Sequence, residues 1–105
     1  MKNIKLFEEI YDNLKKGFTP RVDLHVHTNW TDGQNSVFEM HKEACKKSLS
    51  HIFFSEHSRK NSGDWFFEFS KQVDSLPTDI CKALKGTEVK ILNFNGEIDI
   101  NENFY

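Results

Sequence analysis

The sequence has few cysteines, and they do not form a recognisable pattern. Cys45 and Cys81 are the only two, and no Cys-x-x-Cys motif is present. A zinc knuckle or a dithiol redox motif is therefore not expected. We interpret both residues as free, buried thiols in a reducing compartment.

Excess positive charge and long apolar runs are missing as well. The formal net charge of −2 leaves no basic stripe for sequence-independent binding, so nucleic acid is not expected as a partner. No segment approaches the roughly 20 apolar residues of a membrane span. Residues 1–9 include acids where a signal peptide needs an apolar run. These absences predict a cytoplasmic, soluble protein with no membrane partner.

What the chain does have is enough apolar material for one small packed domain. It has 105 residues, of which 37% are hydrophobic, with ten Phe and two Trp. An amphipathic helix is expected over residues 3–16, with Gly17 as its stop. Ser36 and Glu39 form a capping box that opens a second helix, and Asp64 is expected to cap a third. The inward-facing residues of this third helix are expected to be Phe66, Phe69, Val73 and Leu76.

Three strands are expected between and after these helices. They cover residues 21–27, 51–55 and 80–85, and Asn95-Gly96 then marks a hairpin turn. Strands that alternate with helices predict an α/β fold with a parallel sheet. In such a sheet, groups at the carboxyl ends of the strands gather at one edge, where these folds bind and react.

The segment from Arg21 to Gly33 carries the strongest chemical signal. Alternation along it would point Val22, Leu24 and Val26 to one face of a strand, and Asp23, His25 and His27 to the other. A His-x-His pair on a strand presents two imidazoles side by side to one metal ion. Taken alone, such a pair is more often incidental, so the metal interpretation depends on the other strands.

The other strand ends supply further ligand types. His57 follows the second strand, Glu88 follows the third, and Asp32 lies in the loop after the first. His41 and His51 are interpreted as packing or surface residues. The expected metal ligands are therefore His25, His27, Asp32, His57 and Glu88.

Three imidazoles and two carboxylates favour zinc, manganese or iron over magnesium or calcium. They are too many for one tetrahedral ion, and Glu88 could bridge two ions. Arg59 and Lys60 could receive an anionic substrate, although a solvated loop is the favoured interpretation of those two residues.

Three segments together resemble the first three motifs of the polymerase and histidinol phosphatase (PHP) family. They are Asp23-Leu-His-Val-His-Thr with Thr31-Asp-Gly33, Phe54-Ser-Glu-His57, and Gly86-Thr-Glu-Val89. An amidohydrolase-type barrel also begins with His-x-His, but Asp32-Gly33 and Glu88 fit the PHP pattern better. The hairpin after Val89 is most similar to the histidinol phosphatase and DNA-repair-polymerase-associated branches.

The resemblance implies a distorted seven-stranded α/β barrel that holds two or three Zn, Mn or Fe ions and hydrolyses phosphate esters. It implies that His25 and His27 bind one ion, that Glu88 bridges, and that Asp32 and His57 serve neighbouring ions. The nucleophile would be a metal-bound hydroxide, and the substrate a phosphorylated small molecule or nucleotide. Glu56 stands where the family has Asp before the second-motif histidine, which bears on the hydrogen bond that orients His57.

Length sets the last expectation. A β/α barrel needs about 200 residues or more, so residues 21–105 would supply a truncated PHP domain with motifs I to III, after a helix and connector over 1–20. Three hypotheses remain open. The chain is a phosphoesterase completed by another copy or chain, an inactive metal-binding remnant, or a partner-binding module. The remnant is favoured for the isolated chain and the enzyme for the family, and unpaired sheet edges predict self-association.

Overall fold

The computed structural model describes residues 4–104, so residue 3, where the first helix was expected to begin, lies outside the described part. The elements are α1 (Ile4–Lys15), β1 (Val22–Val26), α2 (Val37–Lys46), β2 (His51–Ser58), α3 (Phe66–Asp74), β3 (Lys82–Val89) and the short 3₁₀ helix η1 (Glu102–Phe104). This order confirms the predicted alternation of strands and helices. Within residues 4–104, no helix has the length and apolar character needed to cross a membrane.

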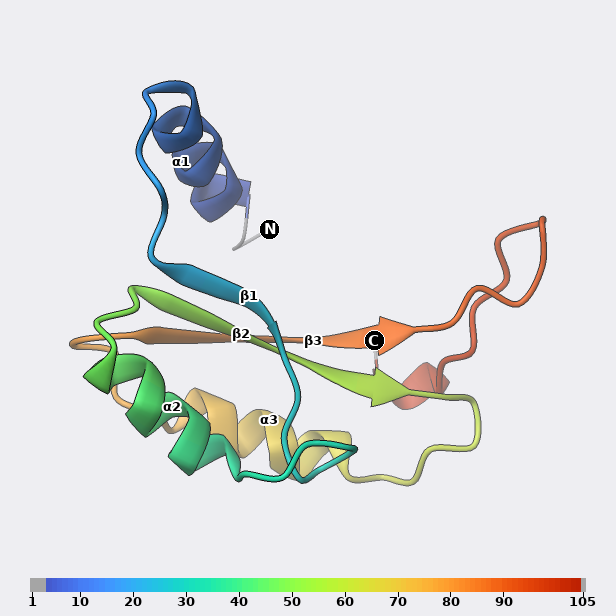
Figure 1. The fold of residues 1–105 in the computed structure, drawn as a ribbon. Helices are drawn as coiled ribbons and strands as arrows, with labels where there is room; N and C mark the ends of the chain where they lie inside the picture. The colour runs from blue at the N-terminus through green and yellow to red at the C-terminus, as the bar shows by residue number, and fades with distance from the viewer. Residues whose placement is uncertain (1–3, 105) are drawn as a thin grey trace.

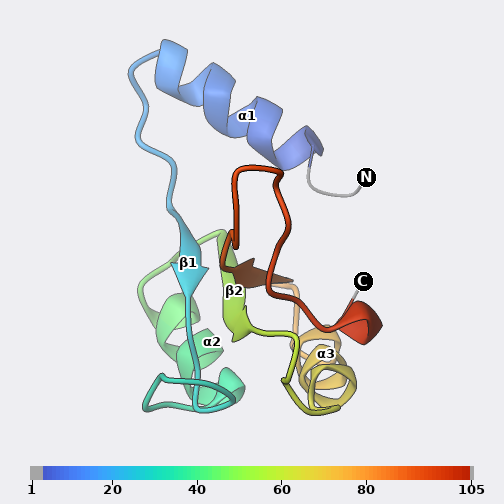
Figure 2. The ribbon, with the colours of Figure 1, turned by 90° about the vertical axis from the view of Figure 1, so that its right-hand side faces the viewer.

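The three strands form a parallel sheet in the order β1-β2-β3. Helices α2 and α3 cover one face of this sheet, and α1 stands away from it on the opposite side (Figures 1 and 2). The α/β class is therefore confirmed. The described residues form an open three-stranded sheet and show no barrel.

The core lies between the sheet and its two helices. Ile52 and Phe54 of β2 point into it, because alternate residues of a strand share one face. The predicted inward side of α3 is confirmed, since Phe69, Val73 and Leu76 are buried, while Phe66 is half-buried. The buried apolar cluster comprises Val26, Val37, Ala44, Ile52, Phe54, Phe69, Val73, Leu76 and Cys81.

Strand β1 departs from simple alternation. Asp23 pairs with Ile52 and Val26 pairs with Phe54, so β1 contains one more residue than β2 between these two pairs. This β-bulge changes the phase of the strand. Within the bulge, the Asp23 carboxylate accepts a hydrogen bond from the His25 amide at 3.2 Å. The prediction that Asp23 shares a face with the histidines is wrong, because Asp23 lines a pocket on the helix-covered face with Val26.

The bounds of β2 and β3 differ from the predicted ranges. Strand β2 does not end at residue 55 but includes Glu56, His57 and Ser58. Strand β3 begins at Lys82 instead of residue 80 and continues through Glu88. Each polar residue near these strand ends is paired in the ladder, and a polar side chain there does not end a strand whose backbone has a partner.

The ends of α3 and the terminal hairpin also differ from expectation. The residue that caps α3 is Trp65, with no side-chain hydrogen bond, and not Asp64. The Asn95-Gly96 turn forms, with Gly96 at φ 84°, but it closes only a single bridge between Ile91 and Ile98. By contrast, Ser36 and Glu39 make both hydrogen bonds of the predicted capping box at α2.

Candidate metal centre

The open face of the sheet carries the candidate ligands at the carboxyl ends of its strands. His25 and His27 come from β1 and the residue just beyond it, and His57 from β2. The ladder aligns His57 directly with Glu88 of β3. Parallel register therefore brings together side chains that are more than thirty residues apart in the sequence.

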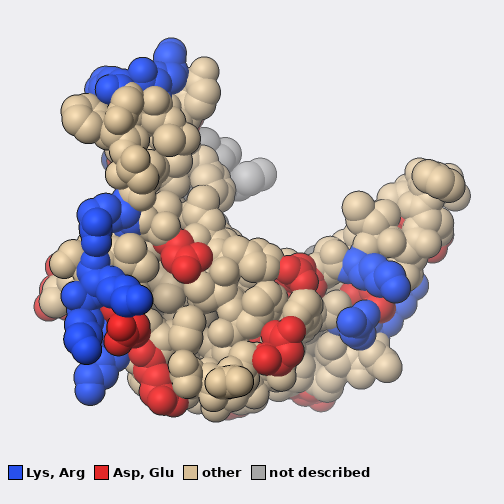
Figure 3. All heavy atoms as spheres, viewed as in Figure 1, with Lys and Arg blue, Asp and Glu red and all other residues tan. Residues whose placement is uncertain are grey.

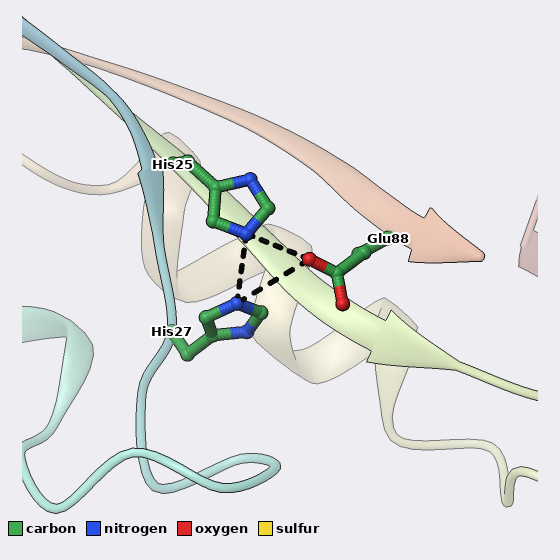
Figure 4. A group of neighbouring side chains, drawn as sticks. All are labelled: His25, His27 and Glu88. Carbon is green, nitrogen blue, oxygen red and sulfur yellow. Dashed lines mark hydrogen bonds and ion pairs between the residues drawn. The ribbon is translucent and has the colours of Figure 1, made fainter. Parts of the chain in front are cut away.

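His25, His27 and Glu88 form a compact group of donor atoms (Figure 4). The two Nε2 atoms of the histidines are 3.0 Å apart. Glu88 Oε1 lies 2.7 Å from His25 Nε2 and 3.8 Å from His27 Nε2. Ligands about 2.1 Å from one tetrahedral ion are separated from one another by about 3.4 Å. The three separations, 2.7, 3.0 and 3.8 Å, lie on both sides of this value, so these atoms are close enough together to share an ion after small adjustments.

A second group adjoins the first and consists of His27, Asp32 and His57. His57 Nε2 lies 2.9 Å from Asp32 Oδ2, and His57 Nδ1 lies 2.8 Å from Glu88 Oε2. His27 Nδ1 lies 3.6 Å from Asp32 Oδ1. Glu88 thus directs one oxygen to the β1 histidines and the other to His57, as a carboxylate between two neighbouring sites would.

One nitrogen atom of this cluster lacks a hydrogen-bond partner. His27 Nδ1 is buried and has no hydrogen-bond partner among residues 4–104. The His27 ring stacks on His57, with centroids 4.4 Å apart, so its position is constrained. A buried polar atom without a partner costs about 1–3 kcal/mol. An imidazole nitrogen facing a carboxylate and a second imidazole suits a divalent transition metal, so the residues fit the group that the sequence predicts.

Electrostatics keep the loop carboxylate ionised. Desolvation is the largest single influence on Asp32 and acts to raise its pKa. The hydrogen bond and charge of His57, with the charge of His27, outweigh it and lower the pKa of Asp32 below its usual value. Asp32 is therefore held as a carboxylate, the form that binds a cation.

Glu56 has a role that the sequence did not reveal. It is fully buried on the helix-covered face, where its carboxylate accepts the Thr28 amide at 2.6 Å and the Thr31 hydroxyl at 2.5 Å. Residue 56 therefore fixes the loop that carries Asp32 and does not orient His57. The available signal was an acid continuing an apolar strand, because a buried carboxylate needs donors.

Arg59 and Lys60 are held by the hairpin. The Arg59 guanidinium lies 3.6 Å from Asp99 Oδ2, and the Lys60 amide donates to Asp99 Oδ1 at 2.7 Å. A pocket of about 340 Å³ lies beside the cluster, lined by Arg59, His57 and Glu88 among others. Binding of an anionic substrate by Arg59 or Lys60 remains a prediction.

The remaining histidines lie outside the cluster. His41 is buried under the sheet, and its Nε2 lies 2.8 Å from the Cys81 carbonyl oxygen. This contact confirms the packing interpretation of His41. His51 begins β2, at the opposite end of that strand from His57.

Curated proteins with related sequences cover about three quarters of the chain. The DNA polymerase/3'-5' exonuclease PolX of Bacillus subtilis is 28% identical over 88 residues, which are 76% of this chain and 15% of PolX. A probable phosphatase of Clostridium acetobutylicum is 33% identical over 85 residues, and one of Vibrio atlanticus is 30% identical over 86. The chain spans 34% of the length of each phosphatase. No family model and no solved structure matches the chain.

Proposed function

We propose that this chain carries metal-binding residues of a PHP-family phosphoesterase. The observation that carries the proposal is the group formed by His25, His27 and Glu88, whose donor atoms lie within 3.8 Å of one another. The relatives named as probable phosphatases and PolX support the choice of reaction. The order of the three motifs supports the choice of family.

Each ligand has a distinct task in this proposal. His25, His27 and Glu88 would hold one ion, and Asp32 and His57 would hold a neighbouring one. The ions would be zinc, manganese or iron, two or three in a complete site. When bound, they would supply an activated water and neutralise charge on the phosphoryl group. No side chain of this chain is assigned as nucleophile or general base.

The exposure of the candidate ligands shows where a substrate could reach them. The His25 side chain is 56% exposed and that of Glu88 is 38% exposed, so the cluster is open to a phosphate ester. We propose that strands additional to β1, β2 and β3 would close this face in a PHP barrel. A cytoplasmic location is proposed because Cys45 and Cys81 are free.

The test is metal content measured together with hydrolysis. Native mass spectrometry of the purified chain, supplied with zinc or manganese, should reveal at least one ion per chain. His25→Ala and Glu88→Ala should reduce the metal content without loss of helical circular dichroism. His51→Ala is the matched control, because it removes a half-buried imidazole at the opposite end of β2. Equal metal content in all four proteins would exclude the proposed centre.

An inactive metal-binding or partner-binding domain is the second candidate function. The observation that favours it is the open sheet, because residues 4–104 form three strands and no barrel, so the cluster has no opposite wall among these residues. Assay with p-nitrophenyl phosphate separates the two functions. Turnover that depends on His25 supports the enzyme, whereas stoichiometric metal with no turnover supports the inactive domain.

A further inference from the structure

Helix α1 has an apolar side that the rest of the described chain leaves uncovered. Phe7, Tyr11 and Leu14 are spaced four and three residues apart, so they form one stripe on the helix. Their exposed fractions are 47%, 61% and 57%. Figures 1 and 2 show α1 standing clear of the sheet, on the side opposite to α2 and α3. A stripe of three large apolar side chains in water favours a partner.

A groove with an apolar floor lies elsewhere on the molecule, between α2 and the edge strand β1. Its volume is about 590 Å³. The apolar residues that line it are Val26, Ala44 and Ile52, which are almost wholly buried, and Met40 and Leu49, which are half-buried. Charged side chains of α2 form its rim, and Figure 3 shows basic residues gathered at that end of the molecule with acidic ones beside them. The groove has the composition of a helix-docking site.

The charges of the two helices match when the helices run antiparallel. On α1, Glu8, Asp12 and Lys15 are four and three residues apart and lie next to the apolar stripe. On α2, Lys46, Lys42 and Glu39 have the same spacing in the reverse direction. Both helices rise about 1.5 Å per residue, so the pairs Glu8–Lys46, Asp12–Lys42 and Lys15–Glu39 align together.

The charges needed for this match are available. Neither Lys42 nor Lys46 makes an ion pair within residues 4–104, whereas Lys47 pairs with Glu43 on the same helix. Hydrogen bonds from Ser36 hold the pKa of Glu39 below its usual value, which keeps its carboxylate charged at the groove rim. Lys15 lies over the Tyr11 ring, 5.3 Å from its centroid, next to the apolar stripe.

We propose that α1 of one copy of this chain docks antiparallel on α2 of a second copy, with Phe7, Tyr11 and Leu14 in the groove against β1. The exchange is reciprocal, so one contact surface on each copy is used twice and the assembly closes as a symmetric dimer. A second copy is the occupant because the groove and α1 lie on opposite sides of the sheet within one chain. The dimer does not depend on metal or on hydrolysis.

Charge reversal provides the test. Sedimentation velocity of the wild-type chain at micromolar concentrations should give a species of twice the chain mass of 12.3 kDa. The variant Glu8→Lys/Asp12→Lys should dissociate at least tenfold more readily, and so should Lys42→Glu/Lys46→Glu. The single variants Glu8→Lys and Glu9→Lys form the matched pair, because each changes the charge by two units; Glu8→Lys should weaken the dimer, whereas Glu9→Lys should leave it intact.

Mixing the two double variants tests whether α1 of each copy binds α2 of the other copy. Each variant alone has two repulsive contacts, whereas the mixed dimer has one wild-type contact and one with both charges reversed. A heterodimer should therefore form from two chains that are monomeric alone. A monomeric wild type, a dimer insensitive to these reversals, or the absence of a heterodimer would overturn the proposal. A compact monomer would mean that α1 folds onto its own chain.

Discussion

Glu56 and Thr28 are joined by a buried hydrogen bond that couples the middle strand to the ligand-bearing loop. The Glu56 carboxylate accepts the Thr28 amide at 2.6 Å from the helix-covered face of the sheet. The Thr28 carbonyl in turn accepts the amides of Thr31 and Gly33. The position of Asp32 is therefore set from the face of the sheet opposite to the candidate metal cluster.

Removal of the Glu56 carboxylate should loosen this loop. Glu56→Ala leaves the Thr28 amide buried without its charged acceptor, and we expect a loss of about 2–3 kcal/mol in the free energy of unfolding. Urea denaturation monitored by Trp fluorescence measures this loss. Glu97→Ala, at an exposed position in the hairpin, should change stability by less than about 0.5 kcal/mol. Equal effects of the two substitutions would contradict the role of Glu56.

Gly33 is fixed by close packing against the end of β1. A Cβ atom added there would lie 2.7 Å from the His27 carbonyl oxygen, and backbone cannot give way as a flexible side chain can. Gly33→Ala should therefore cost about 1–3 kcal/mol and weaken metal binding, because the backbone of His27 and Asp32 would have to shift. Isothermal titration with Mn²⁺ and urea denaturation measure the two effects.

Gly63 provides the comparison for that substitution. A Cβ atom at Gly63 would meet nothing within 4 Å, so Gly63→Ala should leave metal affinity unchanged. Its stability should be unchanged or higher by about 0.4–1 kcal/mol, because alanine has less freedom in the unfolded chain. If Gly33→Ala behaved in the same way, the tight loop would not be required for the site.

The sequence was sufficient to predict that the candidate ligands lie close together, because strand alternation and the parallel order of the strands set their positions. His25 and His27 share a face of a strand, and His57 and Glu88 lie near the ends of adjacent parallel strands. Neither inference requires knowledge of the packing.

The sequence did not predict the positions of residues whose orientation depends on tertiary structure. Asp23 lies on the opposite face from the predicted one because of a β-bulge, which no local sequence pattern indicates. Glu56 is recognisable as a buried anchor only when Thr28 and Thr31 are seen beside it. Arg59 is held by Asp99, forty residues along the chain, which reading the loop alone could not predict.

The Cys81 thiol should be inert in the folded protein. Burial, with a smaller effect of Cys45, raises its pKa to about 11, so almost none of it is thiolate at pH 8. Alkylation by iodoacetamide, located by peptide mass spectrometry, should leave Cys81 unmodified until urea is added. Rapid native-state modification at Cys81 would show that this end of β3 opens.

The same pKa shift predicts a pH dependence of stability. The pKa of the unfolded thiol is near the usual value of 9.0, below the folded value of about 11. The unfolded state therefore loses its proton first, and the contribution of Cys81 to stability, complete below pH 9, declines as pH rises from 9 to 11. Cys81→Ala should lack this part of the decline in urea denaturation midpoints over that range.

Metal binding should stabilise the fold through the ligands on β1 and β3. An ion held by His25, His27 and Glu88 binds the folded chain, because the unfolded chain does not bring these residues together. At a free metal concentration of about 100 times Kd, the free energy of unfolding should rise by about 2.7 kcal/mol. Thermal unfolding with Mn²⁺ or Zn²⁺, and then with excess EDTA, should display this rise and its reversal. His27→Ala should abolish the shift and His51→Ala should retain it. An equal shift in His27→Ala would mean that the ion binds elsewhere on the chain, and the strand-end cluster would then have no part in the stabilisation.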